Sequence, residues 1–165
     1  MQFYEGNASF VDLVIAYVEA GLKAGEACVV LATKPHRELI EARLQERREE
    51  RGALVVALDA DAILAKFMVK GWPDEKRFAA TLGAILRRAA DGGRRRVTVF
   101  GEMVAVLLAQ GNVDATVRLE RLWNQLLSDQ SFSLMCCYPV RTLRAEEHHR
   151  ALRMICVEHS GVRLP

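Results

Sequence analysis

Residues 27–32 have the sequence ACVVLA, an unbroken apolar run between Glu26 and Thr33. A strand with one face in water alternates apolar and polar residues, whereas a strand covered on both faces by helices is apolar throughout. The run therefore predicts a buried strand of a parallel sheet. Further strands are predicted at Phe3-Tyr4, 53–58, 95–100 and 132–138.

The residues before this run predict an amphipathic helix. Between residues 9 and 22 the apolar side chains recur every three or four positions, which places them on one helix face. Ser9 and Asp12 have the form of a capping box at its start. Gly21 and Gly25 are expected to mark its end.

Similar helical patterns separate the other strands. Asp59 is expected to cap a helix over residues 60–69, and Gly71-Trp72-Pro73-Asp74 breaks the chain after it. The remaining predicted helices cover 36–51, 75–90, 103–109, 113–127 and 145–158. Strands that alternate with helices predict one α/β domain over residues 1–165, a three-layer parallel sheet of about five strands.

A parallel sheet also predicts where a ligand would bind. In open parallel sheets the ligand lies in the crevice at the carboxyl ends of the strands. The segments expected to meet there are Tyr4-Asn7, Thr33-His36, Gly101-Met103 and Tyr138-Arg141.

The composition excludes several classes of protein. Hydrophobic residues make up 51% of the 165 residues and charged residues 27%, which argues against disorder and for a single core. A net charge of +2 argues against direct nucleic-acid binding and against an anionic membrane surface. No signal peptide or spanning segment is apparent, so we expect a cytoplasmic protein whose four cysteines are reduced thiols.

The first strand–helix junction has the position of a phosphate loop without its residues. Residues 4–9 contain one glycine, no lysine and the acidic Glu5. A phosphate loop needs glycines that turn backbone amides towards the anion and a lysine that reaches the phosphates. We therefore predict an ordinary capped strand–helix turn with no functional phosphate loop.

Glu102 is the most informative acidic residue. It follows the predicted strand at 95–100 and begins an otherwise apolar helix at the binding edge. A carboxylate in such a place must be hydrogen-bonded, paired or set in a polar pocket. Two interpretations stay open: a ligand contact, or a helix-start carboxylate favoured by the helix dipole.

A second candidate group lies on the helix at 113–127. Glu120, Trp123, Asn124 and Leu127 share one helix face, so an acid, an indole and an amide lie side by side. They could form one wall of a pocket. The alternative, which we favour for Trp123, is that the indole belongs to the core.

The remaining clusters, of arginine, cysteine and histidine residues, give weaker indications of function. Arg87, Arg88 and Arg94-Arg96 surround the Gly92-Gly93 turn, and we favour a solvated turn at the non-binding edge over contact with an acidic partner. Cys156 and His159 have ligand-like spacing, yet no second pair of ligands completes a metal site. No nucleophile elbow is present. We therefore predict no metal, no cofactor and no catalytic residue.

Several short sequence motifs resemble those of the MEDS family, and they occur in the same order along nearly the whole chain. MEDS is a sensory domain found in methanogens, methylotrophs and the dichloromethane-responsive repressor. The motifs are QFYE at 2–5, GLKAGE at 21–26, FGEMV at 100–104, GN at 111–112, LERLWN at 119–124, FSLMCCYP at 132–139 and ICVEHS at 155–160.

The resemblance implies a non-enzymatic signal-input domain that senses a small molecule such as a hydrocarbon derivative. With no room for an output domain, the chain would relay its signal to a separate histidine kinase or transcriptional regulator, or be a fragment of a longer protein. Family members commonly have a histidine where this chain has Met1, which puts any role of that histidine in doubt here. The family also resembles degenerate ATPases of the RecA/KaiC type, so nucleotide binding without hydrolysis stays an alternative.

Two functional hypotheses follow. In the first, a sensor binds its ligand at the strand ends. Its expected ligand-binding residues are Tyr4, Glu102, Glu120, Trp123, Asn124 and His159. In the second, the fold is a protein-interaction module that forms homo-oligomers or binds a partner kinase. An enzyme would need a base and a nucleophile within hydrogen-bond distance, and no such pair is predicted.

Overall fold

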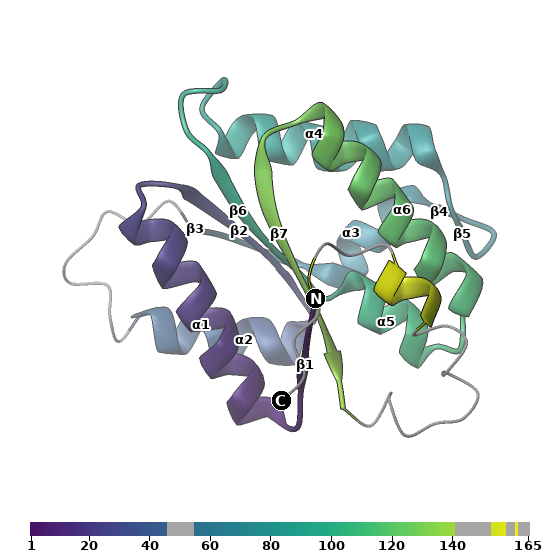
Figure 1. Cartoon of the computed structure of the whole chain (residues 1–165), viewed down its shortest axis with the longest axis horizontal. Coiled ribbons are helices and arrows are strands. Elements are labelled where there is room, and N and C mark those ends of the chain that lie inside the picture. The colour runs from purple at the N-terminus through teal and green to yellow at the C-terminus, as the bar shows by residue number, and fades with distance from the viewer. Residues whose placement is uncertain (46–54, 141–152, 158–160, 162–165) are drawn as a thin grey trace.

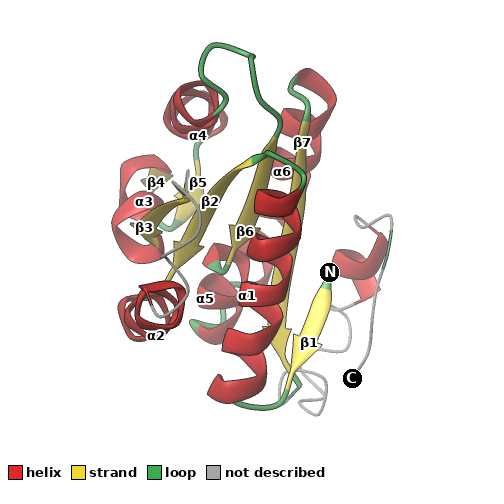
Figure 2. Ribbon diagram, turned by 90° about the vertical axis from the view of Figure 1, so that its left-hand side faces the viewer, coloured by secondary structure: helices red, strands yellow, loops and turns green. Residues whose placement is uncertain are grey.

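Five parallel strands form the central sheet of the computed structural model, which describes residues 1–45, 55–140, 153–157 and 161. Their spatial order is β1-β7-β6-β2-β3 (Figure 1). The strands are β1 (Gln2–Tyr4), β2 (Ala27–Ala32), β3 (Val55–Asp59), β6 (Val97–Gly101) and β7 (Phe132–Pro139). Every neighbouring pair is parallel, so the carboxyl ends lie at one edge (Figure 2). The predicted fold class is confirmed.

Helices cover both faces of the sheet and make the three layers visible in Figure 1. One face is covered by α1 (Asn7–Lys23) and α2 (Lys34–Gln45). The other face is covered by α3 (Ala60–Phe67), α4 (Glu75–Ala89), α5 (Met103–Ala109) and α6 (Val113–Asp129).

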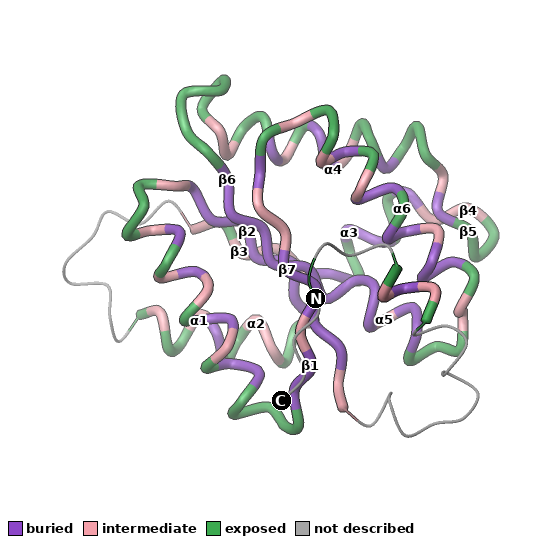
Figure 3. The backbone as a smooth tube through the Cα atoms, viewed as in Figure 1, coloured by how far each residue is buried: buried purple, intermediate pink, exposed green. Residues whose placement is uncertain are grey.

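Each face has its own core, and β2 separates the two. All six residues of β2 are buried (Figure 3), as its unbroken apolar sequence predicts. Val30 points into the core under α1 and α2, and Val29 and Leu31 point into the larger core on the opposite face. Successive side chains of a strand point to opposite faces, so β2 contributes residues to both cores.

The chain after α3 departs from the prediction. The helix expected over 60–69 ends at Phe67, because Met68–Val69 forms β4 and pairs antiparallel with β5 (Trp72–Pro73). Lys70 and Gly71 make the connecting turn with φ of 50° and 79°. Two left-handed residues in succession are typical of a two-residue hairpin turn, so the expected break is a small hairpin.

Two local predictions at α1 and β3 are wrong in detail. Gly6, not Ser9, is the N-cap of α1: the Ser9 hydroxyl donates to the carbonyl of Gly6 at 2.9 Å and accepts from its N–H at 3.2 Å. The strand expected at 53–58 to be covered on both faces is half-buried, since among the described strands β3 pairs only with β2.

Parts of two predicted helices lie outside the described residues. The helix expected at 36–51 begins at Lys34 and is described to Gln45. Of the helix expected at 145–158, residues 153–157 are described, and they are helical. Within the described ranges, no helix is both long and apolar enough to cross a membrane.

Candidate functional site at the carboxyl edge

The neighbouring strands β2 and β6 diverge at their carboxyl ends. From β2 the chain leaves to α2 on one face, and from β6 it leaves to α5 on the opposite face. Such a divergence is a topological switch point, where parallel sheets open a crevice for ligands. The residues directly after these two strands are therefore the first place to look for a site.

Glu102 fills this position. Its residue is 4% exposed, and its carboxylate accepts hydrogen bonds from the N–H of Thr33 at 2.8 Å and from the Thr33 hydroxyl at 3.1 Å. The other carboxylate oxygen lies 2.6 Å from Nδ1 of His36. Glu102 is also the N-cap residue of α5, but its side chain makes no hydrogen bond to that helix. The side chain instead joins the β6–α5 junction to the β2–α2 junction.

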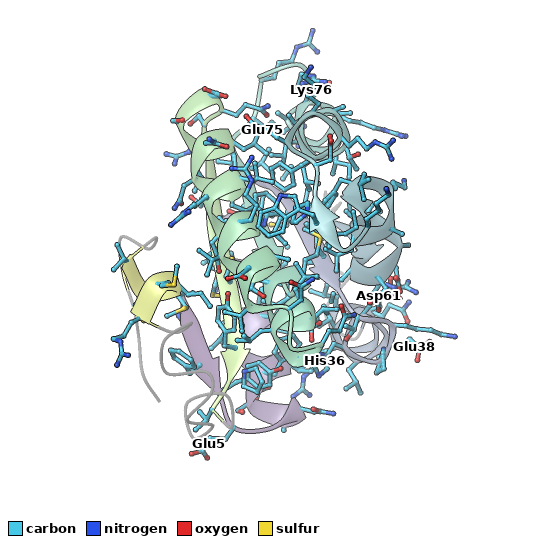
Figure 4. All side chains as sticks on the ribbon, turned by 90° about the vertical axis from the view of Figure 1, so that its right-hand side faces the viewer. Glu5, His36, Glu38, Asp61, Glu75 and Lys76 are labelled. Atoms are coloured by element: carbon cyan, nitrogen blue, oxygen red, sulfur yellow. The ribbon has the colours of Figure 1, made fainter. Side chains whose placement is uncertain are left out.

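His36 extends the network to a third junction. Its Nε2 lies 3.3 Å from Oδ1 of Asn7, the first residue of α1. Its ring stacks on Phe10 with centroids 4.1 Å apart and planes 27° from parallel. Figure 4 places His36 towards the same end of the molecule as Glu5, away from Glu75 and Lys76. An imidazole held by two polar groups and one aromatic face has a fixed orientation.

Tyr4 supplies an aromatic wall beside this network. Its ring centroid is 4.8 Å from that of Phe10 and 6.3 Å from that of His36. The Tyr4 carbonyl accepts a hydrogen bond from the N–H of Val140 at 2.7 Å, which ties the end of β1 to the residue after β7. A carboxylate, an imidazole and a hydroxyl beside aromatic rings can together hold a polar group and an apolar body.

The other predicted group lies on the opposite face of the sheet. Glu120 is buried in α6 and accepts a hydrogen bond from the Tyr138 hydroxyl at 2.6 Å. The Cys136 thiol lies 3.8 Å from the same carboxylate. Burial, and then the Glu120 charge, raise the pKa values of Tyr138 and Cys136 well above their usual ranges, so both groups keep their protons.

Trp123 lies deep in the core under α6. Its residue is 1% exposed, and its ring makes edge-to-face contacts with Phe78 and Phe132 at 5.3 Å and 6.1 Å. Its indole Nε1 has no acceptor within the part of the chain that the structure describes. Asn124 is half-buried on the same helix, and His159 lies outside the described residues. The ligand roles of Glu120, Trp123, Asn124 and His159 stay predictions.

The structure therefore unites Tyr4 and Glu102 with three residues to which the sequence assigned no role: Asn7, Thr33 and His36. The segment Thr33-His36 was placed at this edge, but no side chain in it was singled out. In the described ranges, no three His, Cys, Asp or Glu side chains gather as metal ligands.

A comparison with family models decides the family. Residues 1–154 match the methanogen/methylotroph, DcmR sensory domain, abbreviated MEDS. The chain belongs to the MEDS family. MEDS domains are sensory, so the role of this chain is signal input. No curated protein and no solved structure matches the chain.

The matched range contains the whole network of Glu102 and ends before His159. The relationship of the MEDS fold to ATPases of the RecA/KaiC type stays a prediction. At the junction where an ATPase would have its phosphate loop, this MEDS domain joins β1 to α1 through Glu5 and Gly6 alone.

Proposed function

We propose that this MEDS domain senses a small molecule at the carboxyl edge of its sheet, where the ligand competes for the hydrogen bonds of Glu102. The observation that carries the proposal is a buried carboxylate, at the switch point of a parallel sheet, that is shared by two junctions. A carboxylate needed only to start α5 would bond to that helix, which this one does not.

The surroundings of Glu102 favour one class of ligand. A carboxylate accepts hydrogen bonds, so a hydroxyl or amine on the ligand would replace the contact that Nδ1 of His36 now makes with it. The ring of Tyr4, which packs against the buried Phe10, would be the aromatic contact for a short apolar body. A small hydrocarbon derivative with one donor group satisfies both requirements.

The same contacts supply a route for the signal. His36 lies on α2, Asn7 begins α1 and Glu102 precedes α5, so a ligand that displaces His36 changes how these helices are held together. A ligand that binds one arrangement better than the other shifts the population towards it. Leu39, three residues after His36 on α2, is 45% exposed and could present the change to a separate kinase or transcriptional regulator.

The test is a thermal-shift screen with short alcohols, amines and halogenated alkanes. At about a hundred times its dissociation constant, a ligand adds about 2.7 kcal/mol of stability and raises the melting temperature by several degrees. Glu102→Gln should fold and lose the shift, whereas Glu38→Gln, an exposed neighbour of His36 on α2, should keep it. Equal shifts in wild type and E102Q would reject the proposed site.

A protein-interaction module is the second candidate, favoured by one observation. Val56 on the edge strand β3 is 43% exposed, which is unusual because the strands of a parallel sheet are normally covered on both faces. Self-association measured by sedimentation, abolished by Val56→Lys and accompanied by no shift across the ligand panel, would favour this candidate. Magnesium-ATP in the same screen tests the nucleotide alternative.

A further inference from the structure

A cavity of about 470 Å³ lies at the opposite edge of the sheet, beside the amino ends of β6 and β7. It is formed between the last turn of α4, the turn at 91–96 and residues 130–132. The exposed connection from α4 to β6 is visible in Figure 3. This volume is within the range of sites that hold small molecules.

The lining of this cavity is strongly cationic. Arg87, Arg94, Arg95 and Arg96 line it, and no carboxylate does. Two of these arginines have acidic partners that do not line the cavity: Arg94 lies 3.6 Å from the exposed Asp91, and Arg96 lies 3.6 Å from Glu26. For Arg87 and Arg95 the described residues supply no ion-pair partner. Arg87 and Arg95 are both exposed, so their guanidinium groups are accessible to a ligand from solvent, and an anion there would relieve the repulsion between neighbouring arginines.

The floor of the cavity is apolar. Leu86, Val97 and Phe132 are buried and line it, while Gln130 and Ser131 contribute polar groups. An inorganic ion would use only the arginines and leave this floor uncovered. The combination favours an anion that also carries an apolar body.

Arg94, Arg95 and Arg96 are presented by an ordered turn, and Arg87 by the last turn of α4. The N–H groups of Gly93 and Arg95 both donate to the carbonyl of Ala90, at 3.0 Å and 3.1 Å. Asp91, Gly92 and Gly93 have φ of 48°, 66° and 92°, a run of left-handed conformations that turns the chain back from α4. A turn already held in place loses less conformational entropy when a ligand binds.

We infer that this cavity binds a small organic anion, with a phosphate or carboxylate group held by Arg87 and Arg95 and an apolar body on the floor. Planar guanidinium groups bind both kinds of oxyanion through paired hydrogen bonds. The site is separate from the Glu102 network and does not depend on the proposed function.

The test is calorimetric titration with phenyl phosphate, benzoate and inorganic phosphate at constant ionic strength. Wild type should bind phenyl phosphate or benzoate saturably and more tightly than inorganic phosphate, and the tighter of the two identifies the preferred group. The double variant Arg87→Gln/Arg95→Gln should bind at least tenfold more weakly. Arg88→Gln changes an exposed arginine of α4 outside the lining and should stay within twofold of wild type.

Three results would overturn the inference. One is no saturable binding of either organic anion by wild type up to millimolar concentration. Another is an equal loss in R88Q and in the double variant, which would indicate general surface charge. The third is binding that perturbs the amide resonances of Thr33 and Glu102 rather than those of residues 94–97 and 130–132.

Discussion

Glu102 shows how a single buried carboxylate can join two junctions of the chain, with His36 extending the network to a third. Its carboxylate accepts two hydrogen bonds from Thr33 and contacts Nδ1 of His36, and both residues follow the neighbouring strand β2. A buried ionised group that loses a donor bears the cost of its own desolvation. The stability of the edge should therefore respond to each donor separately.

Thr33→Val tests one of these donors. The substitution keeps the shape of the side chain and the backbone N–H, and removes only the hydroxyl that donates to Glu102 at 3.1 Å. We expect a loss of about 1–3 kcal/mol in the free energy of unfolding, measured by urea denaturation. Glu38→Ala, an exposed change on the adjoining helix, should stay within about 0.5 kcal/mol. An unchanged free energy in T33V would show that this hydrogen bond does not support Glu102.

The buried thiols make a prediction about pH. Burial raises the pKa of Cys28 to about 11 and that of Cys137 to about 12, from an ordinary value of 9.0. Between the unfolded and folded pKa values the folded chain holds a proton that the unfolded chain has lost, so stability is full below about pH 9 and falls as the pH rises. The urea midpoint should be lower at pH 10.5 than at pH 8.

Cys28→Ala provides the control for this titration. It removes one of the raised thiols, so the fall in midpoint between the two pH values should become smaller, although the variant is less stable at both. Equal midpoints for wild type at pH 8 and pH 10.5 would contradict the assigned protonation states.

At the scale of elements, α1 shows what a sequence pattern can and cannot specify. Its apolar spacing predicted the helix and its buried face, but Gly21 was interpreted as the start of the exit. The helix continues to Lys23, and Gly21 is buried within it. A Cβ built at Gly21 would lie 2.7 Å from Oγ1 of Thr98 on β6, so this glycine permits close packing of helix on sheet.

Gly21→Ala should therefore destabilise the domain although alanine favours helix. We expect a loss of about 1–3 kcal/mol, the usual cost of overpacking, because the Thr98 hydroxyl is held by Glu26 and cannot turn away. Gly83→Ala in α4 is the matched control, since its Cβ would meet only the ends of Arg87 and Gln130. That variant should be neutral or gain up to about 1 kcal/mol. The reverse order of the two in thermal denaturation would refute the packing argument.

Elements that depend on distant pairing were the ones that the sequence could not specify. The cap at Asp59 is confirmed, because its side chain accepts from the N–H of Ala62 at 2.9 Å, a local contact. The hairpin of β4 and β5 was missed, since each strand has two residues and no periodicity. The exposure of β3 was missed because an edge position depends on the order of all the strands.

For the whole molecule, the fold was predictable and the site only in part. Helices alternating with apolar strands specify a parallel sheet and the edge where its strands end, which placed Tyr4 and Glu102. The partner of Glu102 depends on β2 lying next to β6, which no local pattern encodes. Glu120 and Trp123 do share a helix face, but that face packs on the sheet core rather than on the edge.

The cavity near Arg87 and Arg95 and the network of Glu102 lie at opposite edges of one sheet. Both β6 and β7 run from the cavity to the carboxyl edge of the sheet. Ligand binding at the carboxyl edge can be tested without knowing the signalling partner.

The most direct measurement is a two-dimensional amide NMR titration of the full chain with the first compound that raises its melting temperature. We expect the largest shift changes at Thr33, His36 and Glu102, and we expect them to vanish in Glu102→Gln. Changes centred instead on the amides of α6 around Trp123, with Thr33 and Glu102 unmoved, would contradict this expectation.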